Sequence, residues 1–272
     1  MSNITTIGDN FLQNCSNLEN INLSGLSNLQ TIGNYFLQNC TNLKNIDLSE
    51  LINLQSIGNY FLENCINLEI INLSELINLQ TIGNYFLLSS NLESINLSGL
   101  TNLQSIGNNF LNFSKLTKIN ISGLTKLQII GNDFLHHCIN LIGIKMYGLT
   151  NLQTIGFHCL IDCYNLINIG DNFLKNCSNL KNIDLTELTY VKIIGDNFLQ
   201  NCINLKNIDL SGLTNVKTIG INFLQNCSNL ETINLSKLTN LKTIGSRYLR
   251  NYSKLNEFKK HFEFLSKIWE DS

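Results

Sequence analysis

The chain has 272 residues, 43% of them hydrophobic and 14% charged, with a formal net charge of −2. A near-neutral chain without a long run of one sign argues against a nucleic-acid or membrane-surface partner, because both attract a basic face. No stretch reaches the roughly 18 apolar residues of a membrane span.

One internal repeat, marked by the dipeptide Ile-Gly, dominates the chain. From Gly8 to Gly245 its glycines recur at a nearly constant spacing, with one much shorter interval between Gly156 and Gly170. A period of roughly 25 residues indicates a solenoid, in which each turn buries its apolar face against the next. We expect about ten turns over residues 1–252.

Each unit contains a segment L-x-x-I-x-L that predicts a short, half-buried strand. In the second unit Ile46 and Leu48 alternate with the polar Asp47, which is the period of a strand. We expect these strands to stack into one parallel, concave sheet. Nine such segments occur, beginning at Leu18, Leu43, Leu68, Leu92, Leu116, Leu141, Leu180, Leu205 and Leu230.

The rest of each unit is expected to return along the convex side. Leu54 and Ile57 supply two more inward side chains, and Gly58 is expected to allow a turn with φ above zero. The predicted fold is therefore an α/β, mostly β, solenoid. The residues that follow fit one short helical turn with an apolar inner face: Phe61, Leu62 and Cys65.

One region breaks the pattern. Lys145 stands where the other units carry Asn or Asp, Tyr147 follows it, and the next unit lacks eleven residues. We expect a kink or an irregular turn over residues 141–172. Departure from a local rule marks functional or strained sites, and simple deletion drift explains it equally well.

Residues 253–272 lack the repeat and predict an amphipathic helix that caps the last turn. Its rival interpretation is a partner-binding helix. The cap is favoured because an uncovered terminal core is the larger problem for a solenoid. The apolar residues at helical spacing are Leu255, Phe258, Phe262, Leu265 and Trp269.

The nine cysteines are an odd number and mostly share the seventh position after the glycine, which predicts an internal ladder of small apolar side chains. With no secretory signal at Met1, they favour an intracellular, reducing compartment. One group has the ligand types of zinc, but the repeat register places its members on opposite sides of the wall, so we predict neither a metal site nor a cofactor. That group is His136, His137, Cys138, His158, Cys159 and Cys163.

The unit resembles the BspA-type leucine-rich repeat, whose pattern runs I-G-x-x-A-F-x-x-C-x-x-L-x-x-I-x-I-P. It departs from that pattern where Phe36-Leu37 replaces Ala-Phe and where Ser49 replaces the proline. The resemblance implies a protein-binding role and no catalytic machinery. The matching positions are Ile32, Gly33, Cys40, Leu43, Ile46 and Leu48.

We therefore expect a scaffold that binds an unidentified protein on its concave sheet. The alternative is a structural protein that self-associates through its uncapped N-terminal turn or sheet edge. The exposed positions expected to contact a partner are Asn72, Asn96, Asn120, Lys145, Tyr147, Asp184 and Asp209.

Overall fold

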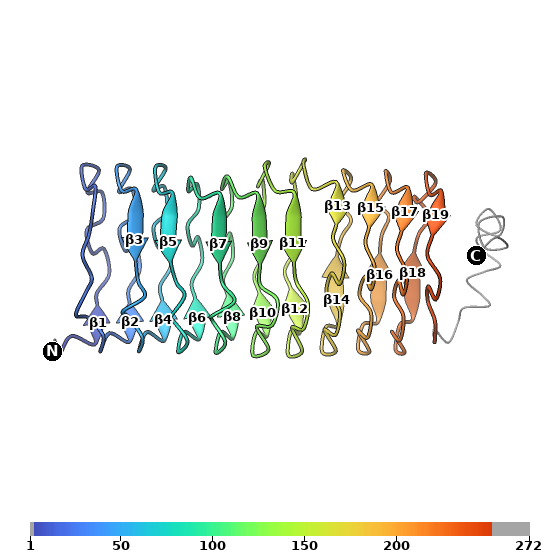
Figure 1. Ribbon diagram of the computed structural model, residues 1–272, viewed down its shortest axis with the longest axis horizontal. Helices are drawn as coiled ribbons and strands as arrows, with labels where there is room; N and C mark the ends of the chain where they lie inside the picture. The colour runs from blue at the N-terminus through green and yellow to red at the C-terminus, as the bar shows by residue number, and fades with distance from the viewer. Residues whose placement is uncertain (1–2, 252–272) are drawn as a thin grey trace.

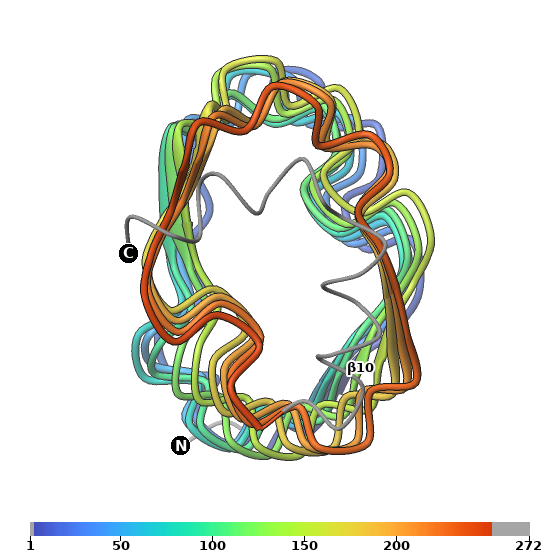
Figure 2. The ribbon, with the colours of Figure 1, turned by 90° about the vertical axis from the view of Figure 1, so that its right-hand side faces the viewer.

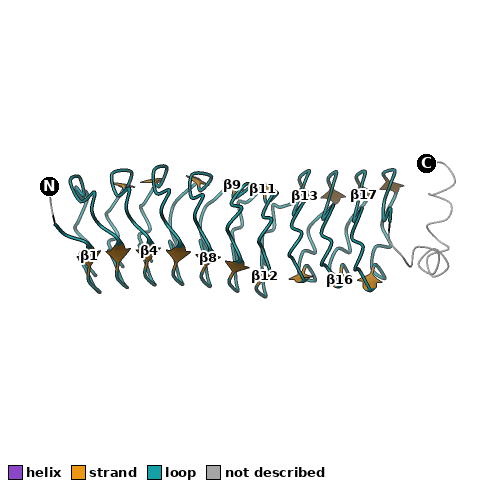
Figure 3. Ribbon diagram, turned by 90° about the horizontal axis from the view of Figure 1, so that it is seen from below, coloured by secondary structure: helices purple, strands orange, loops and turns teal. Residues whose placement is uncertain are grey.

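The computed structural model describes residues 3–251, which form a nearly straight stack of turns (Figures 1 and 3). Viewed along the stack, successive turns superpose into a closed oval outline with two long sides (Figure 2). Every strand pair is parallel and most pairs join residues 24 or 25 positions apart, so that each turn pairs with its neighbours in register.

The strands are of two types. The L-x-x-I-G segments form two-residue strands: β1 Thr6–Ile7, β2 Thr31–Ile32, β4 Ser56–Ile57, β6 Thr81–Ile82, β8 Ser105–Ile106, β10 Ile129–Ile130, β12 Thr154–Ile155, β13 Asn168–Ile169, β15 Ile193–Ile194, β17 Thr218–Ile219 and β19 Thr243–Ile244. Eight of the nine L-x-x-I-x-L segments form three-residue strands, and the one that begins at Leu18 forms none. These strands are β3 Asn45–Asp47, β5 Ile70–Asn72, β7 Ser94–Asn96, β9 Lys118–Asn120, β11 Gly143–Lys145, β14 Asn182–Asp184, β16 Asn207–Asp209 and β18 Thr232–Asn234.

The core runs along the inside of the stack as ladders of like residues. Phe36 and Phe61 are fully buried and their rings stack with centroids 5.3 Å apart. The next rings continue this ladder through Phe134, and it resumes from Phe173 to Phe223. The cysteines form a parallel ladder, in which the Cys65 thiol donates to the Leu37 carbonyl of the previous turn at 3.2 Å.

The prediction of helical turns on the convex side was wrong, since the described residues form no helix. We call the segment that follows each Ile-Gly dipeptide an arm. In the arm after Gly33 the residues Tyr35, Leu37 and Asn39 have φ of 60°, 54° and 60°, and the residues between them do not have positive φ. This alternation turns successive amides in opposite directions. The N–H groups of Tyr35 and Asn39 therefore donate to the next turn, and that of Leu37 donates to the previous turn.

The helix prediction failed because the apolar spacing of the arm does not distinguish the two conformations. Phe36, Leu37 and Cys40 are all fully buried in the alternating arm, as they would be on the inner face of a helix. A helix bonds its amides within itself, whereas the alternating arm uses them to join turns. The same three positions have positive φ in all eleven arms that follow an Ile-Gly dipeptide.

The expected positive φ at Gly58 is also absent, and the repeated glycine has another physical reason. A Cβ on Gly58 would lie 2.6 Å from the carbonyl carbon and oxygen of Gly33 in the turn below. Gly33 and Gly83 meet their neighbours equally closely. The glycine column therefore permits close contact between successive backbones.

The short interval between Gly156 and Gly170 completes half a turn of the stack. An ordinary turn consists of a shorter half, as from Ile46 to Ile57, and a longer half, as from Ile57 to Ile71. Here one shorter half is missing, and two longer halves follow each other. The stack continues through residues 141–172, but the two strand types exchange sides.

This exchange corrects the expectation of one sheet built from all the L-x-x-I-x-L strands. The first face is a ten-stranded sheet, in the order β1-β2-β4-β6-β8-β10-β12-β14-β16-β18, that changes strand type between β12 and β14. The second face carries β3 and β5, then β7, β9 and β11, then β13, β15, β17 and β19. We call the change on both faces the phase slip.

Two further expectations concern the ends of the chain and the membrane. The capping helix expected over residues 253–272 lies outside the described residues, as does the end of the solenoid at residue 252. Within residues 3–251 no helix has the length and apolar character needed to cross a membrane.

Candidate functional site

The phase slip separates the residues expected on one binding surface. Asn96, Asn120 and Lys145 form one column on the second face, because β7, β9 and β11 pair in that register. Asn72 lies on β5, beside β7 on the same face. Asp184 and Asp209 pair with each other on the first face, on the opposite side of the stack.

The Asn and Asp members of this set have a structural role at the ends of their strands. The Asn96 Oδ1 atom accepts the Ser98 N–H at 3.1 Å and the Ser98 hydroxyl at 2.8 Å. Such a side-chain turn needs only one oxygen, which explains why Asn and Asp interchange at this position. The same bond, from the backbone N–H two residues later to the side-chain oxygen, forms at Asn72, Asn120, Asp184 and Asp209.

Lys145 and Tyr147 are the two expected residues without that role. Both are exposed, Tyr147 by 42%, and neither side chain has a hydrogen-bond or ion-pair partner within residues 3–251. The backbone turn at Gly148, with φ of +71°, matches that at Gly123, with φ of +78°, so the turn is kept here without a side-chain bond from Lys145. These two side chains are therefore available to a ligand.

A groove of about 750 Å³ lies on the second face where the L-x-x-I-x-L strands give way to β13. Asn96, Asn120 and Lys145 line it together with Lys118 and Tyr147. On the far side of the slip the column of Asn and Lys side chains is replaced by glycine, beginning at Gly170, so the floor drops there. Asp171 and Asn172 complete the lining.

A second groove of about 650 Å³ lies at the corresponding place on the first face. Here the glycine column ends at Gly156 and the column of Asp184 and Asp209 begins. Burial acts to raise the pKa of Asp209, but the hydrogen bonds from Ser211 and Asn234 together act more strongly. The pKa of Asp209 is therefore below its ordinary value. The two grooves have the same origin, since each forms where the phase slip places a glycine column beside a column of polar side chains.

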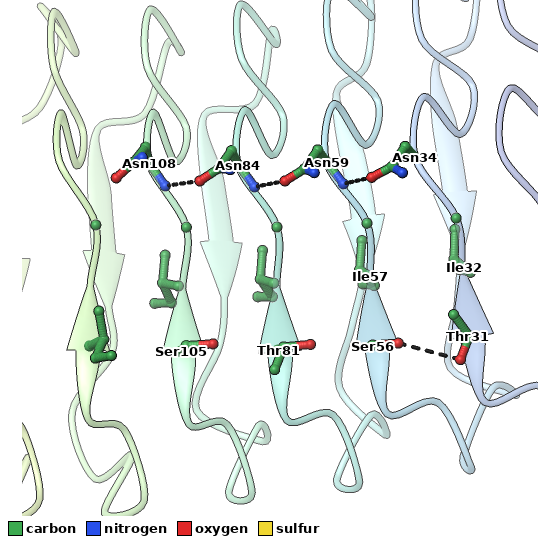
Figure 4. Close-up of a pocket in the computed structure, with 18 of the residues that line it drawn as sticks. Thr31, Ile32, Asn34, Ser56, Ile57, Asn59, Thr81, Asn84, Ser105 and Asn108 are labelled. Atoms are coloured by element: carbon green, nitrogen blue, oxygen red, sulfur yellow. Dashed lines mark hydrogen bonds between the residues drawn. The ribbon is translucent and has the colours of Figure 1, made fainter.

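A third, shallow hollow of about 650 Å³ extends along the first face before the slip (Figure 4). Glycines form its floor, hydroxyl residues of β2 to β8 form one wall, and asparagines form the other. Each asparagine oxygen accepts the backbone N–H of the asparagine one turn on, for example Asn59 Oδ1 from Asn84 at 2.7 Å. We call this hollow the hydroxyl–amide trough.

The histidines expected to be poor zinc ligands lie on the outside of the arms. His136 lies between Asp133 and Asp162, with N–O distances of 3.5 and 3.6 Å, and His158 approaches Asp133 at 3.3 Å. Cys159 and Cys163 are buried on the other side of the wall. Among the described residues no three His, Cys, Asp or Glu side chains converge as metal ligands.

The cysteine ladder is inaccessible and has low thiolate character. Burial raises the pKa of Cys65 and of Cys227 to about 12, and that of Cys138 to about 11. All nine cysteines are free, and Cys15 of the first turn is the one that is partly exposed. A buried protonated thiol is a poor nucleophile, so the ladder acts as packing.

Short parallel strands stacked by leucine, isoleucine, cysteine and asparagine ladders define a leucine-rich-repeat solenoid. The model of the BspA type leucine-rich repeat region, with six copies, matches residues 5–142, 78–169 and 163–268. The chain belongs to this family. A comparison with curated proteins finds no match.

The chain is also similar to solved structures. A leucine-rich repeat protein from Bacteroides ovatus is 23% identical, and the alignment covers 94% of this chain and 76% of that protein, with a TM-score of 0.33. The pneumococcal vaccine antigen PcpA is 16% identical over 80% of this chain and 60% of its own, with a TM-score of 0.36. A leucine-rich cell surface protein from Faecalibacterium prausnitzii is 15% identical over 85% and 83%, with a TM-score of 0.32.

Proposed function

We propose that the protein is a non-enzymatic scaffold that binds another protein in the groove around Lys145 and Tyr147. The observation that carries this proposal is the pair of exposed, unpartnered side chains at the phase slip. Most exposed columns repeat from turn to turn, and a repeating surface gives a partner no unique register. Within residues 3–251 the slip occurs once on the second face, so its groove gives a partner one defined position.

The chemistry of the groove favours a partner segment with an acidic and an apolar side chain. Lys118 and Lys145 supply two cations, and the stem of Lys118 lies 3.7 Å from the Cβ position of Gly143. Tyr147 and Ile142, which is 52% exposed, supply apolar surface. An aromatic anchor beside a cation is typical of the residues that dominate interface energies.

The test uses phage-displayed random peptides selected on the intact chain. We expect enriched peptides to carry Asp or Glu close to an aromatic or branched apolar residue. Their binding should fall at least tenfold in the double variant Lys145→Glu/Tyr147→Ala, because charge reversal and loss of the anchor each remove roughly 1 kcal/mol or more. Circular dichroism checks that the variant is folded.

The matched control is Lys181→Glu, which makes the same charge change on the first face, where Lys181 is exposed. It should leave peptide binding unchanged. Peptides that bind the double variant as well as the original chain, or a selection without enrichment, would contradict the proposed site.

The alternative is a structural protein that self-assembles through its first turn. Phe11 is 40% exposed there, whereas the equivalent Phe36 is fully buried. Among residues 3–251 β1 pairs with β2 and with no other strand, and an unpaired edge strand is a template for association. Light-scattering mass across a concentration series tests this. Growth with concentration supports self-assembly, and a constant mass near 31 kDa rejects it.

We propose that the protein resides in an intracellular, reducing compartment. It is supported by the nine free cysteines, eight of which are buried in the core where oxidation would disrupt packing. Localisation of the tagged chain by microscopy tests it, and detection at the outer surface of intact cells would reject it.

A further inference from the structure

The hydroxyl–amide trough has polar groups on both walls that no described residue engages. The Thr81 and Ser105 hydroxyls make no hydrogen bond within residues 3–251, and neither do the amide NH₂ groups of Asn84 and Asn108. The asparagines are held upright by their oxygens, which accept backbone N–H groups (Figure 4). Their NH₂ groups are therefore oriented donors, one per turn.

The floor of the trough is kept open by its glycines. A Cβ on Gly83 would lie 2.5 Å from the backbone of Gly58, and one on Gly107 would lie 2.5 Å from Gly83. No side chain fits at these positions, so the hollow of about 650 Å³ persists along the stack. A flat ligand can approach the backbone here, because the glycines carry no side chain.

The trough repeats with the spacing of the turns. The tyrosine rings of the same turns report this spacing directly, with centroid distances of 4.7 Å between Tyr35 and Tyr60 and 4.5 Å between Tyr60 and Tyr85. A ligand that follows the trough over several turns must present a polar group at this interval.

The trough is also almost free of charge. Among the described residues that line it, Asp9 at one end is the only charged one. Phosphate backbones require cations, so nucleic acid is a poor ligand. A neutral ligand rich in hydroxyl groups matches a wall of amide donors and a wall of hydroxyls.

We propose that the hydroxyl–amide trough binds an extended, neutral polysaccharide that runs along the solenoid axis with one sugar ring over each turn. The ring lies on the glycine floor, and its hydroxyl groups bond to the hydroxyl wall and the asparagine NH₂ groups. A pyranose in an extended β-linked chain advances by a length close to the turn spacing. Alternate rings are turned over, so each wall meets the two edges of the ring in alternation, and both edges carry hydroxyl groups. An extended peptide presents same-face side chains about 6.6 Å apart and loses register within two turns.

The test is isothermal titration of the intact chain with cellulose-type and chitin-type oligosaccharides of two to six rings. We expect affinity to rise with each ring until the ligand matches the four strands that carry the hydroxyl wall, β2, β4, β6 and β8. An α-linked hexamer of glucose, which coils, should bind at least tenfold more weakly. The variant Thr81→Val/Ser105→Ala should lose roughly fivefold or more, because it removes two hydrogen-bonding groups.

The matched control is Thr218→Val, which removes the same hydroxyl from a strand of the same type, β17, on the opposite face. It should bind like the original chain, and so should Lys145→Glu/Tyr147→Ala, so that this proposal and the protein-binding groove are tested separately. Absence of binding by every β-linked oligosaccharide at millimolar concentration would overturn the proposal. So would affinity that does not depend on length, or selected peptides whose binding is lost in Thr81→Val/Ser105→Ala.

Discussion

Substitution of Gly83 by alanine tests the close packing of the turns. The new Cβ would lie 2.5 Å from the Gly58 carbonyl carbon and oxygen and 2.7 Å from the Asn59 nitrogen. Ordinary contact begins at 3.4 Å, so the two turns must separate by about 0.9 Å (3.4 minus 2.5). The hydrogen bond from Gly83 N–H to the Ile57 carbonyl, now 2.9 Å, would then exceed bonding distance.

The expected cost combines these two effects. Overpacking of this kind costs about 1–3 kcal/mol, and the lost hydrogen bond about 1 kcal/mol, which together predict a loss of about 2–4 kcal/mol. The matched control is Gly8→Ala, because a Cβ on Gly8 meets nothing within 4 Å. That variant should be neutral or stabilised by roughly 0.4–1 kcal/mol through the unfolded chain.

The assay is urea unfolding followed by circular dichroism, with amide hydrogen exchange to locate the change. Gly83→Ala should lower the midpoint and increase exchange in the turns around Gly58 and Gly83, since a repeat stack responds locally. Equal stability of Gly83→Ala and Gly8→Ala would refute the reasoning, because the repeated glycine would then have no packing role.

Three further outcomes follow from the same geometry. Arg247 is exposed with φ of 59°, so Arg247→Asn should raise the free energy of unfolding in urea by about 1 kcal/mol, because Asn tolerates this conformation better. An unchanged or lower value would count against the left-handed arm. At pH 8 iodoacetamide should modify the partly exposed Cys15 well before the buried Cys65, because burial raises the pKa of Cys65 to about 12. Mass spectrometry of the digested protein measures the labelling of each cysteine, and equal labelling of Cys15 and Cys65 would contradict the buried ladder. The hydrogen bond from the Ser49 N–H lowers the pKa of Asp47 below its ordinary value of 3.8. The stabilisation by the ionised Asp47 is therefore present above pH 3.8 and is lost as the pH falls through the lower pKa of the folded state. Asp47→Asn should lose less stability than the original chain on acidification below pH 3.8, and identical acid unfolding curves would reject a stabilising role for the Asp47 carboxylate.

The sequence predicted the stacked architecture well because its dominant signal is local. The pattern around Ile46 and Leu48 identifies a half-buried strand, and copying it at a constant period requires neighbouring turns to share a core. The inward position of Cys65 was likewise predicted by its shared offset, and it is fully buried.

The second sheet was missed because the L-x-x-I-G segment carries a shorter version of the same signal. Leu54 and Ile57 were predicted to point inward, and both are buried, but two-residue strands have no alternation to identify them. The available signal was the equivalence of Ile46 and Ile57, each the inward isoleucine of an L-x-x-I segment within one turn. It also predicts that loss of a segment of that length removes half a turn and exchanges the faces.

The candidate site shows a similar division. The departure at Lys145 and Tyr147 was visible from aligned repeats alone, and these side chains line a groove at the phase slip. The structural role of Asn96 and Asp209 was not visible in the sequence. Each accepts a hydrogen bond from the backbone N–H two residues later, and the only sequence sign of that bond is the Ser or Thr at this later position. Placement of Asp209 on the opposite face depends on the slip and could not be read from its own unit.

The exchange of faces is the central claim, and cysteine crosslinking tests it most directly. Thr154 and Asn182 are exposed neighbours in the first-face sheet, paired across the slip between β12 and β14. The double variant Thr154→Cys/Asn182→Cys should be joined by a short bis-maleimide, whereas Lys145→Cys/Asp184→Cys should not, because those residues lie on opposite faces. Crosslinking of the second pair but not the first would mean that all L-x-x-I-x-L strands share one sheet, and would contradict the account.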